Sequence, residues 1–193
     1  MDYSTMIRIA TLLFAVFFIT ACSTRQEGAN FKGSTEQRLV TYSIDHMMQN
    51  LTPEDMGIIV GQKLLLKSHF VIDNQVVKYA HQRLQAELAD RFQVNFVETP
   101  EQADYRLDMF YTSLGTDRDS AGLSIPIVNL SDPEQSAIVN ILAIDMYHGI
   151  AEGNFYLTEL ANGKVVKKGK IHSRVKSDKF STPFFSFPIS HID

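Results

Sequence analysis

Residues 154–176, NFYLTELANGKVVKKGKIHSRVK, decide the fold class of this chain. Two stretches with the composition of β-strands flank the dipeptide Asn162-Gly163. Both central positions of a type I′ turn need positive φ, and Asn-Gly is the pair that best tolerates it. The sequence therefore predicts an antiparallel hairpin, with strands at 154–160 and 164–176 joined by a type I′ turn.

Further strands are expected upstream of this hairpin. Apolar and polar residues alternate from 105 to 112, which is the period of a half-buried strand. The more apolar residues 138–147 indicate a central strand. Residues 63–67 (KLLLK) read as a short buried strand, although an apolar run alone does not exclude a helix. Residues 94–97 indicate one more strand.

Two helices complete the predicted fold. Residues 35–50 carry apolar side chains at helical spacing, with Ser34 and Gln37 as a capping box and Thr52-Pro53 as the stop. Residues 74–91 form the second helix, capped by Asp73 or Asn74. The order of elements predicts an α+β fold, with two helices packed on one face of a mixed, mainly antiparallel sheet of about five strands.

The N-terminal segment has a pattern of its own, from which we expect a targeting signal. Residues 9–19 form an apolar run of eleven residues, which as a helix spans about 16 Å, too short for a bilayer core of about 30 Å. Small residues and Cys22, the single cysteine, follow this run. The segment resembles the lipobox of a bacterial lipoprotein, with Ile19 at the position where leucine is commonest.

The resemblance implies a processed and lipidated protein. Residues 1–21 would be the signal peptide, 22–33 a lipidated flexible tether, and 34–193 a single α+β periplasmic domain. Cys22 would carry a diacylglycerol and an N-acyl chain such as palmitate, with no other cofactor. Ser23 after the cysteine implies sorting to the outer membrane, facing the periplasm. A chain with no other cysteine forms no internal disulfide.

A second resemblance covers most of the mature chain. Its short motifs are Thr35-Glu36-Gln37-x-Leu39, Ala103-Asp104, Gly115-Thr116-Asp117, Ile125-Pro126 and Pro133-Glu134. Together they resemble a family of bacterial lipoproteins defined by a domain of unknown function. The chain departs from that pattern at Ser124, where glycine often precedes Ile-Pro. The resemblance supports the lipoprotein assignment and implies no activity.

Composition and motifs limit the function classes. A net charge of −4 argues against a nucleic-acid binder. The catalytic and phosphate-binding motifs of common enzyme families are absent from the sequence. We therefore expect no catalytic residue and no metal site, with a hydrolase using Ser124 or a metal held by His148, His172 and His191 as the least favoured alternatives.

Residues 113–136 are expected to form a long connection, of the kind that often binds partners or acts as a lid. An ordered excursion that covers a sheet edge explains the same residues. Calcium binding by its carboxylates lacks the spacing of known loops. The candidate functional residues of this segment are Gly115, Thr116, Asp117, Arg118, Asp119, Ile125 and Pro126.

The last strand carries a run of basic residues. Alternation places His172 and the four cations Lys168, Lys170, Arg174 and Lys176 on one face, and Val165, Ile171 and Val175 on the other. These four cations are candidates for contact with anionic lipid or an acidic partner, and a solvated edge strand is the alternative.

The tail, residues 180–189 (FSTPFFSFPI), is rich in phenylalanine and proline. We expect it either to fold back on the domain or to dock on a partner. The leading functional reading is a non-enzymatic envelope lipoprotein that acts through protein contacts. A periplasmic ligand-binding module with a deep apolar pocket is the alternative.

The substitution Cys22→Ala tests the anchor. Without the thiol no acyl chain is attached, so the variant should leave the outer-membrane fraction, whereas the wild type stays in it. Membrane fractionation with metabolic palmitate labelling measures this, and a wild-type chain that is unlabelled and soluble would contradict it.

Overall fold

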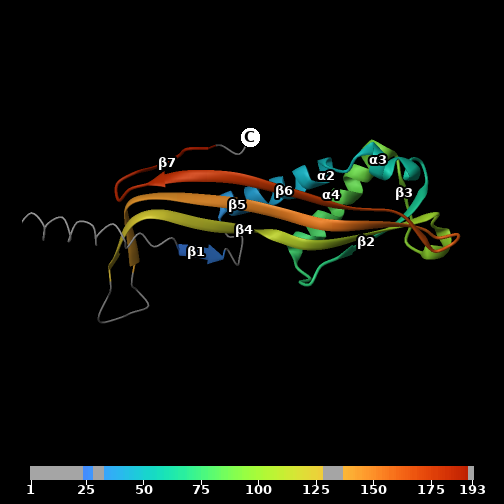
Figure 1. Ribbon diagram of the computed structural model, residues 1–193, viewed down its shortest axis with the longest axis horizontal. Helices are drawn as coiled ribbons and strands as arrows, with labels where there is room; N and C mark the ends of the chain where they lie inside the picture. The colour runs from blue at the N-terminus through green and yellow to red at the C-terminus, as the bar shows by residue number, and fades with distance from the viewer. Residues whose placement is uncertain (1–23, 28–32, 128–136, 191–193) are drawn as a thin grey trace, which may run out of the picture. The chain divides into compact units, whose positions relative to one another are not determined.

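The computed structural model describes residues 24–27, 33–127 and 137–190 of the chain. These residues form one seven-stranded sheet with strand order β3-β2-β4-β5-β6-β7, and β1 pairs with β4 (Figure 1). The strands are β1 Thr24–Glu27, β2 Lys63–His69, β3 Asn95–Phe96, β4 Tyr105–Ile127, β5 Ala137–Glu159, β6 Lys164–Ser181 and β7 Ser186–Pro188.

The helices are α2 Ser34–Gln49, α3 Pro53–Met56 and α4 Gln75–Phe92, with short 3₁₀ turns at Gly57–Ile59 and Pro100–Gln102. Strand β2 is parallel to β3 and β4, whereas β6 and β7 are antiparallel. The predicted α+β class is confirmed, and the described sheet has seven strands where about five were expected. Among the described residues, no helix combines the length and apolar character needed to cross a membrane.

The described residues divide into two compact units. The helical unit comprises 33–117 and 147–177, together with Glu27. The tail unit comprises 24–26, 118–127, 137–146 and 178–190. Apart from residues 24–27 and 33, both units fall within the predicted domain 34–193. The limits of that domain stay a prediction.

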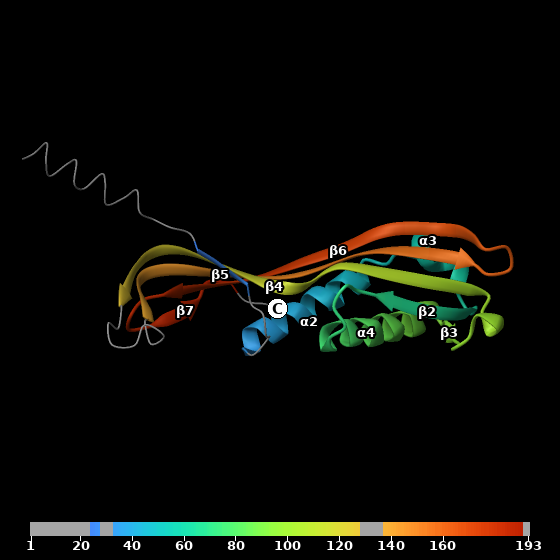
Figure 2. The same cartoon turned by 90° about the horizontal axis from the view of Figure 1, so that it is seen from below.

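The core of the helical unit lies between its helices and one face of its sheet (Figure 2). Ile44 and Met47 of α2 and Leu84 and Leu88 of α4 are fully buried. From the strands, the same cluster receives Leu107, Met109 and Tyr111 of β4, Ala151, Phe155 and Leu157 of β5, and Ile171 of β6. The predicted alternation along 105–112 therefore marks a real division between a buried and an open face.

The helix starts differ in how they are capped. Asn74 caps α4 as predicted, because its side chain accepts hydrogen bonds from the amides of Val76 and Val77 at 3.0 and 3.2 Å. The capping box at Ser34 is wrong. Ser34 is already helical, and the cap is Gly33, whose carbonyl accepts the Gln37 amide at 3.0 Å without any side-chain cap.

The predicted hairpin is confirmed, but its turn type is not. Strands β5 and β6 are joined by residues 160–163, and only Gly163 of this connection has positive φ, at 67°. A four-residue connection is usually built on a type I turn, which needs fewer left-handed residues than type I′. Asn162 stabilises the turn through its side chain, accepting the Lys164 amide at 2.9 Å and donating to Glu159 at 2.6 Å.

The predicted connection at 113–136 is wrong over residues 113–127. Residues 113–127 continue strand β4, and β5 already begins at Ala137. Residues 128–136 lie outside the described residues. Glycine, aspartate and proline disfavour strands locally, but pairing with neighbouring strands overrides that preference. Gly115, Thr116, Asp117, Arg118, Asp119, Ile125 and Pro126 therefore lie in a strand and not in a loop.

At the N-terminal end the tether prediction changes, whereas at the C-terminal end one of the two expected placements of the tail is observed. Residues 24–27 of the predicted flexible tether form β1, which pairs with β4. The phenylalanine-rich tail folds back, because β7 pairs with the end of β6. Pro183 lies in the connection between β6 and β7, and Pro188 ends β7 at the sheet edge, where a nitrogen without hydrogen leaves no ladder bond unmade.

Gly169 tests the packing of β6 on the core. A Cβ atom there would lie 2.6 Å from the Phe155 ring, which is 1% exposed. Gly169→Ala should lower the free energy of unfolding by about 1–3 kcal/mol, as overpacked core variants do. Thermal melting measures this. Gly115→Ala is the matched control, because no atom lies within 4 Å of its added Cβ, and equal melting temperatures for both variants would contradict the packing.

Candidate functional site

The candidate site lies on the face of the helical unit's sheet that points away from α2 and α4, here called the open face (Figure 2). Leu107, Met109 and Tyr111 of β4 enter the core. Because side chains alternate along a strand, Arg106, Asp108 and Phe110 lie on the open face. The same alternation places His69 of β2 and Tyr156 of β5 there.

A three-residue charge network lies on this face. Asp108 accepts from Arg106 Nε at 2.7 Å through one carboxylate oxygen and contacts His69 Nε2 at 3.0 Å through the other. Parallel pairing of β2 and β4 sets His69 opposite Phe110 and Lys67 opposite Asp108. Both oxygens of Asp108 are thus held by partners, which explains how a carboxylate only 8% exposed is tolerated.

Aromatic rings adjoin the network. The His69 and Phe110 rings are stacked with centroids 4.3 Å apart, and Tyr156 meets Phe110 edge-on at 5.8 Å. Phe110 and Tyr156 remain 42% and 39% exposed. The Arg106–Asp108 ion pair, the His69–Asp108 contact and the ring stacking hold these rings in place while leaving surface for contact.

The basic stripe, Lys168, Lys170, Arg174 and Lys176 of β6, is exposed along its whole length, as predicted. Ile171 and Val175 are buried on the opposite face. Val165 departs from the prediction, because it is 47% exposed while Val166 packs against the core. Among the described residues, no salt bridge neutralises a member of the stripe.

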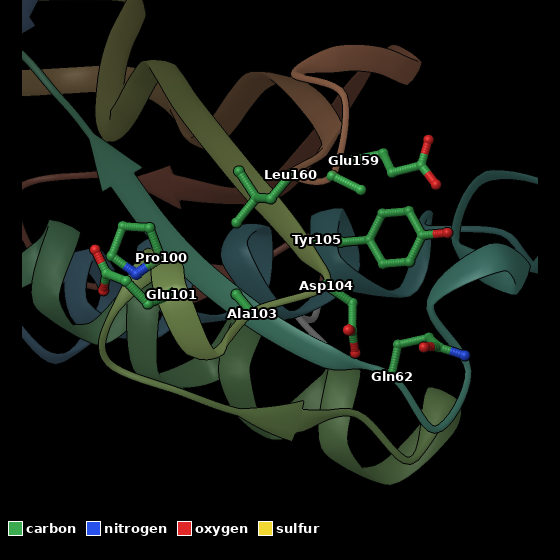
Figure 3. A pocket seen from close by; sticks show the side chains of 9 residues that line it. Gln62, Pro100, Glu101, Ala103, Asp104, Tyr105, Glu159 and Leu160 are labelled. Carbon is green, nitrogen blue, oxygen red and sulfur yellow. The ribbon is translucent and has the colours of Figure 1, made fainter.

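A hollow of about 460 Å³ lies where β4 begins and β5 ends (Figure 3). Gln62, Asp104, Tyr105 and Glu159 line it, with Pro100 at its side. Two of its carboxylates already serve the fold, because Asp104 accepts the Lys63 amide at 3.0 Å and Glu159 accepts from Asn162. The hollow is polar, unlike the deep apolar pocket that a ligand-binding module predicts.

One serine–histidine contact occurs in the helical unit. Ser68 Oγ lies 2.8 Å from His81 Nδ1, and burial lowers the pKa of His81. Among the described residues no carboxylate contacts His81, so the pair lacks the third member of a triad. Ser68 is on β2 and His81 on α4, and their hydrogen bond joins helix to sheet.

The remaining predicted histidines are dispersed. His148 is buried, His172 is exposed, and His191 lies outside the described residues, as do Cys22 and the side chain of Ser124. Within the described ranges, no group of three or more potential ligands is placed to hold a metal ion.

Arg118, predicted as part of a functional loop, has a structural contact in the tail unit. Its Nη2 atom lies 3.0 Å from Asp145 Oδ1, and Ser181 donates to the other oxygen of Asp145 at 3.0 Å. Asp145 is 3% exposed and joins β4, β5 and β6. Sequence reasoning missed it, although a lone aspartate within the apolar run 138–147 was a signal.

The network on the open face was also missed. His69, Asp108, Phe110 and Tyr156 come from three strands, and only the alternation in β4 hinted at which side chains share a face.

Comparison with known proteins gives limited similarity. No protein-family model matches the chain, and no curated protein does. The LpoB C-terminal domain from Salmonella enterica matches 70% of this chain and 97% of its own, with 11% identity and a TM-score of 0.37. The LpoB C-terminal domain from Escherichia coli matches 69% of this chain and 96% of its own, with 12% identity and a TM-score of 0.37.

A neuraminyllactose-binding hemagglutinin homolog from Helicobacter pylori matches 69% of this chain and 74% of its own, with 17% identity and a TM-score of 0.36. The chain is thus structurally similar, at low identity, to these three chains. Similarity at this level assigns it no partner, ligand or activity.

The Asp145 cluster predicts a pH dependence. Burial raises the pKa of Asp145, but hydrogen bonds from Arg118, Ser120 and Ser181 and the charge of Arg118 outweigh it, so the pKa lies below its ordinary value. A lowered folded-state pKa stabilises the fold above the unfolded pKa of about 4, and that stabilisation is lost as pH falls through the folded value.

Asp145→Asn should therefore be less stable than wild type at neutral pH, by about 1–3 kcal/mol. The difference should shrink as the pH falls below about 4. Denaturant unfolding across this range measures it, with the exposed Asp90→Asn on α4 as control. A difference that stays constant with pH would contradict the ionised cluster.

Proposed function

We propose that this chain is a non-enzymatic lipoprotein of the bacterial outer membrane that faces the periplasm and acts by binding an envelope protein. In this proposal Cys22 carries the lipid anchor and the helical unit carries the binding surface. The observation that carries the proposal is the open face, which presents both exposed aromatic rings and an un-neutralised basic stripe.

The chemistry of this face suits a protein partner. Interfaces between proteins are enriched in aromatic residues and arginine at their centres and depleted of lysine there, with charged residues at the rim. Phe110 and Tyr156 supply exposed rings, and Arg106 is held beside them by Asp108. The network fixes these groups before binding, which lowers the conformational entropy lost on association.

The basic stripe specifies the charge of the partner. Lys168, Lys170, Arg174 and Lys176 present positive charge on alternate residues of one strand. A row of cations attracts an acidic surface and repels a basic one. We therefore infer that the partner presents an acidic patch to β6 and an apolar contact to the rings.

Charge reversal on the stripe tests this function. In intact cells, Lys170→Glu combined with Arg174→Glu should reduce crosslinking to the partner by about tenfold or more, because two attractive contacts become repulsive. Crosslinking followed by affinity purification and mass spectrometry measures recovery from cells that carry the lipidated chain.

The matched control reverses two exposed cations on the helices, Arg38 of α2 and Lys78 of α4. Unchanged recovery with this control, and a melting temperature equal to that of wild type in both variants, would attribute the loss to the stripe. The function is contradicted if both double variants recover the same proteins in the same amounts as wild type.

A further inference from the structure

The tail unit presents a structured group of exposed aromatic side chains, here called the aromatic hairpin (residues 180–189). Strand β7 pairs with β6 so that Phe187 lies opposite Phe180 and Ser186 opposite Ser181. The tip is closed by Thr182, whose amide and hydroxyl both donate to the Phe185 carbonyl at 2.9 Å. Its hydroxyl also accepts the Phe185 amide at 3.1 Å.

The rings of this hairpin face outward. Phe184, at the tip, is 93% exposed, Phe185 59%, Phe187 48% and Ile189 54%. The Phe185 and Phe187 rings are stacked at 6.2 Å, and Phe180 lies 5.0 Å from Phe187. The backbone of the hairpin is ordered by hydrogen bonds, yet its apolar side chains are exposed to water. Such a surface is typical of a site that a lipid bilayer or another molecule covers.

We propose that the aromatic hairpin inserts into the interfacial region of the lipid bilayer beside the acyl anchor. The inference rests on the lipidation of Cys22 in the proposed function. Cys22 lies two residues before β1, and an extended chain of two residues reaches only about 7 Å. Strand β1 pairs with β4, and residues 24–26 belong to the tail unit, so the anchor holds this unit at the membrane surface.

The charge beside the rings agrees with a lipid surface. Lys179 is exposed and lies opposite Pro188 in the β6–β7 pairing, next to the apolar side chains. Cations that flank aromatic and aliphatic side chains are typical of segments that lie at an anionic bilayer interface.

A second copy of the chain is a poorer fit to this edge. Pairing of β7 with another β-strand needs a row of free amide hydrogens, and Pro188 has none. Insertion of side chains into the bilayer interface makes no such demand, since the hairpin backbone is held by its pairing with β6 and by Thr182, and only the rings need to enter lipid.

Tryptophan fluorescence gives a direct test, because the chain contains no tryptophan. Phe185→Trp in the lipidated full chain, reconstituted in vesicles of phosphatidylethanolamine and phosphatidylglycerol, should emit at shorter wavelength than in detergent-free buffer without vesicles. Brominated lipid should quench it several-fold more strongly than Tyr156→Trp on the open face. Absence of quenching at position 185, or equal quenching at both positions, overturns the proposal.

A chain without acyl groups separates the hairpin from the anchor. For residues 22–193 with Cys22→Ser, combined Phe184→Ser, Phe185→Ser and Phe187→Ser should weaken partition into the same vesicles by about tenfold or more, since each exposed ring loses apolar contact. The control combines Ile58→Ser, Val71→Ser and Ile72→Ser, three exposed apolar residues of the helical unit. Equal partition of the two triple variants overturns the proposal.

The outcomes also distinguish this proposal from the proposed function. Vesicle partition of the Cys22→Ser chain does not depend on lipidation or on the acidic partner, so either can fail while the hairpin still binds lipid. Circular dichroism of each variant establishes that it is folded. A blue shift of the Phe185→Trp variant that requires no vesicles and disappears on dilution of the protein would assign the hairpin to self-association and overturn the proposal.

Discussion

The packing of α2 and α4 on one face of the sheet is the interaction on which the helical unit depends. Helix α2 lies directly against β5, because a Cβ atom at Gly149 would come within 2.2 Å of the Leu39 carbonyl oxygen. Leu39, Ile44, Leu84 and Leu88 are buried completely by this packing. Once one face of each strand is committed to the helices, alternation of side chains assigns the other residues to the open face. The candidate binding surface is thus the complement of the core.

The two units are stabilised in different ways. The helical unit buries a large apolar cluster that draws on helices and strands alike. In the described part of the tail unit, large apolar side chains such as Leu142, Ile144 and Phe184 stay exposed, while the buried Asp145 links three strands through Arg118 and Ser181. A polar cluster orients strands without consuming apolar surface. The exposed apolar side chains of the tail unit are thus available for the proposed membrane contact.

Local signals predicted what local interactions control. The helices at 34–49 and 75–92, the Asn74 cap and the hairpin around Gly163 follow from periodicity, capping chemistry and turn residues within a few positions of one another. The extension of β4 through 113–127 did not follow, since strand pairing with residues far along the chain overcame glycine, aspartate and proline. The prediction of a type I′ turn was wrong for a related reason. The length of the connection, and not its Asn-Gly pair alone, sets the backbone conformation.

By itself, the sequence determined the α+β class, the two main helices, the hairpin and the alternation that exposes the basic stripe. It also contains the segment around Cys22 that resembles a lipobox and from which the anchor is proposed. Only the tertiary structure decided that His69 and Asp108, 39 residues apart, meet Arg106 beside the exposed Phe110 ring, and that Asp145 holds Arg118 and Ser181 together. Side chains from different strands become neighbours only through sheet order and register. Pairing between distant segments sets these, and no short window of sequence records them.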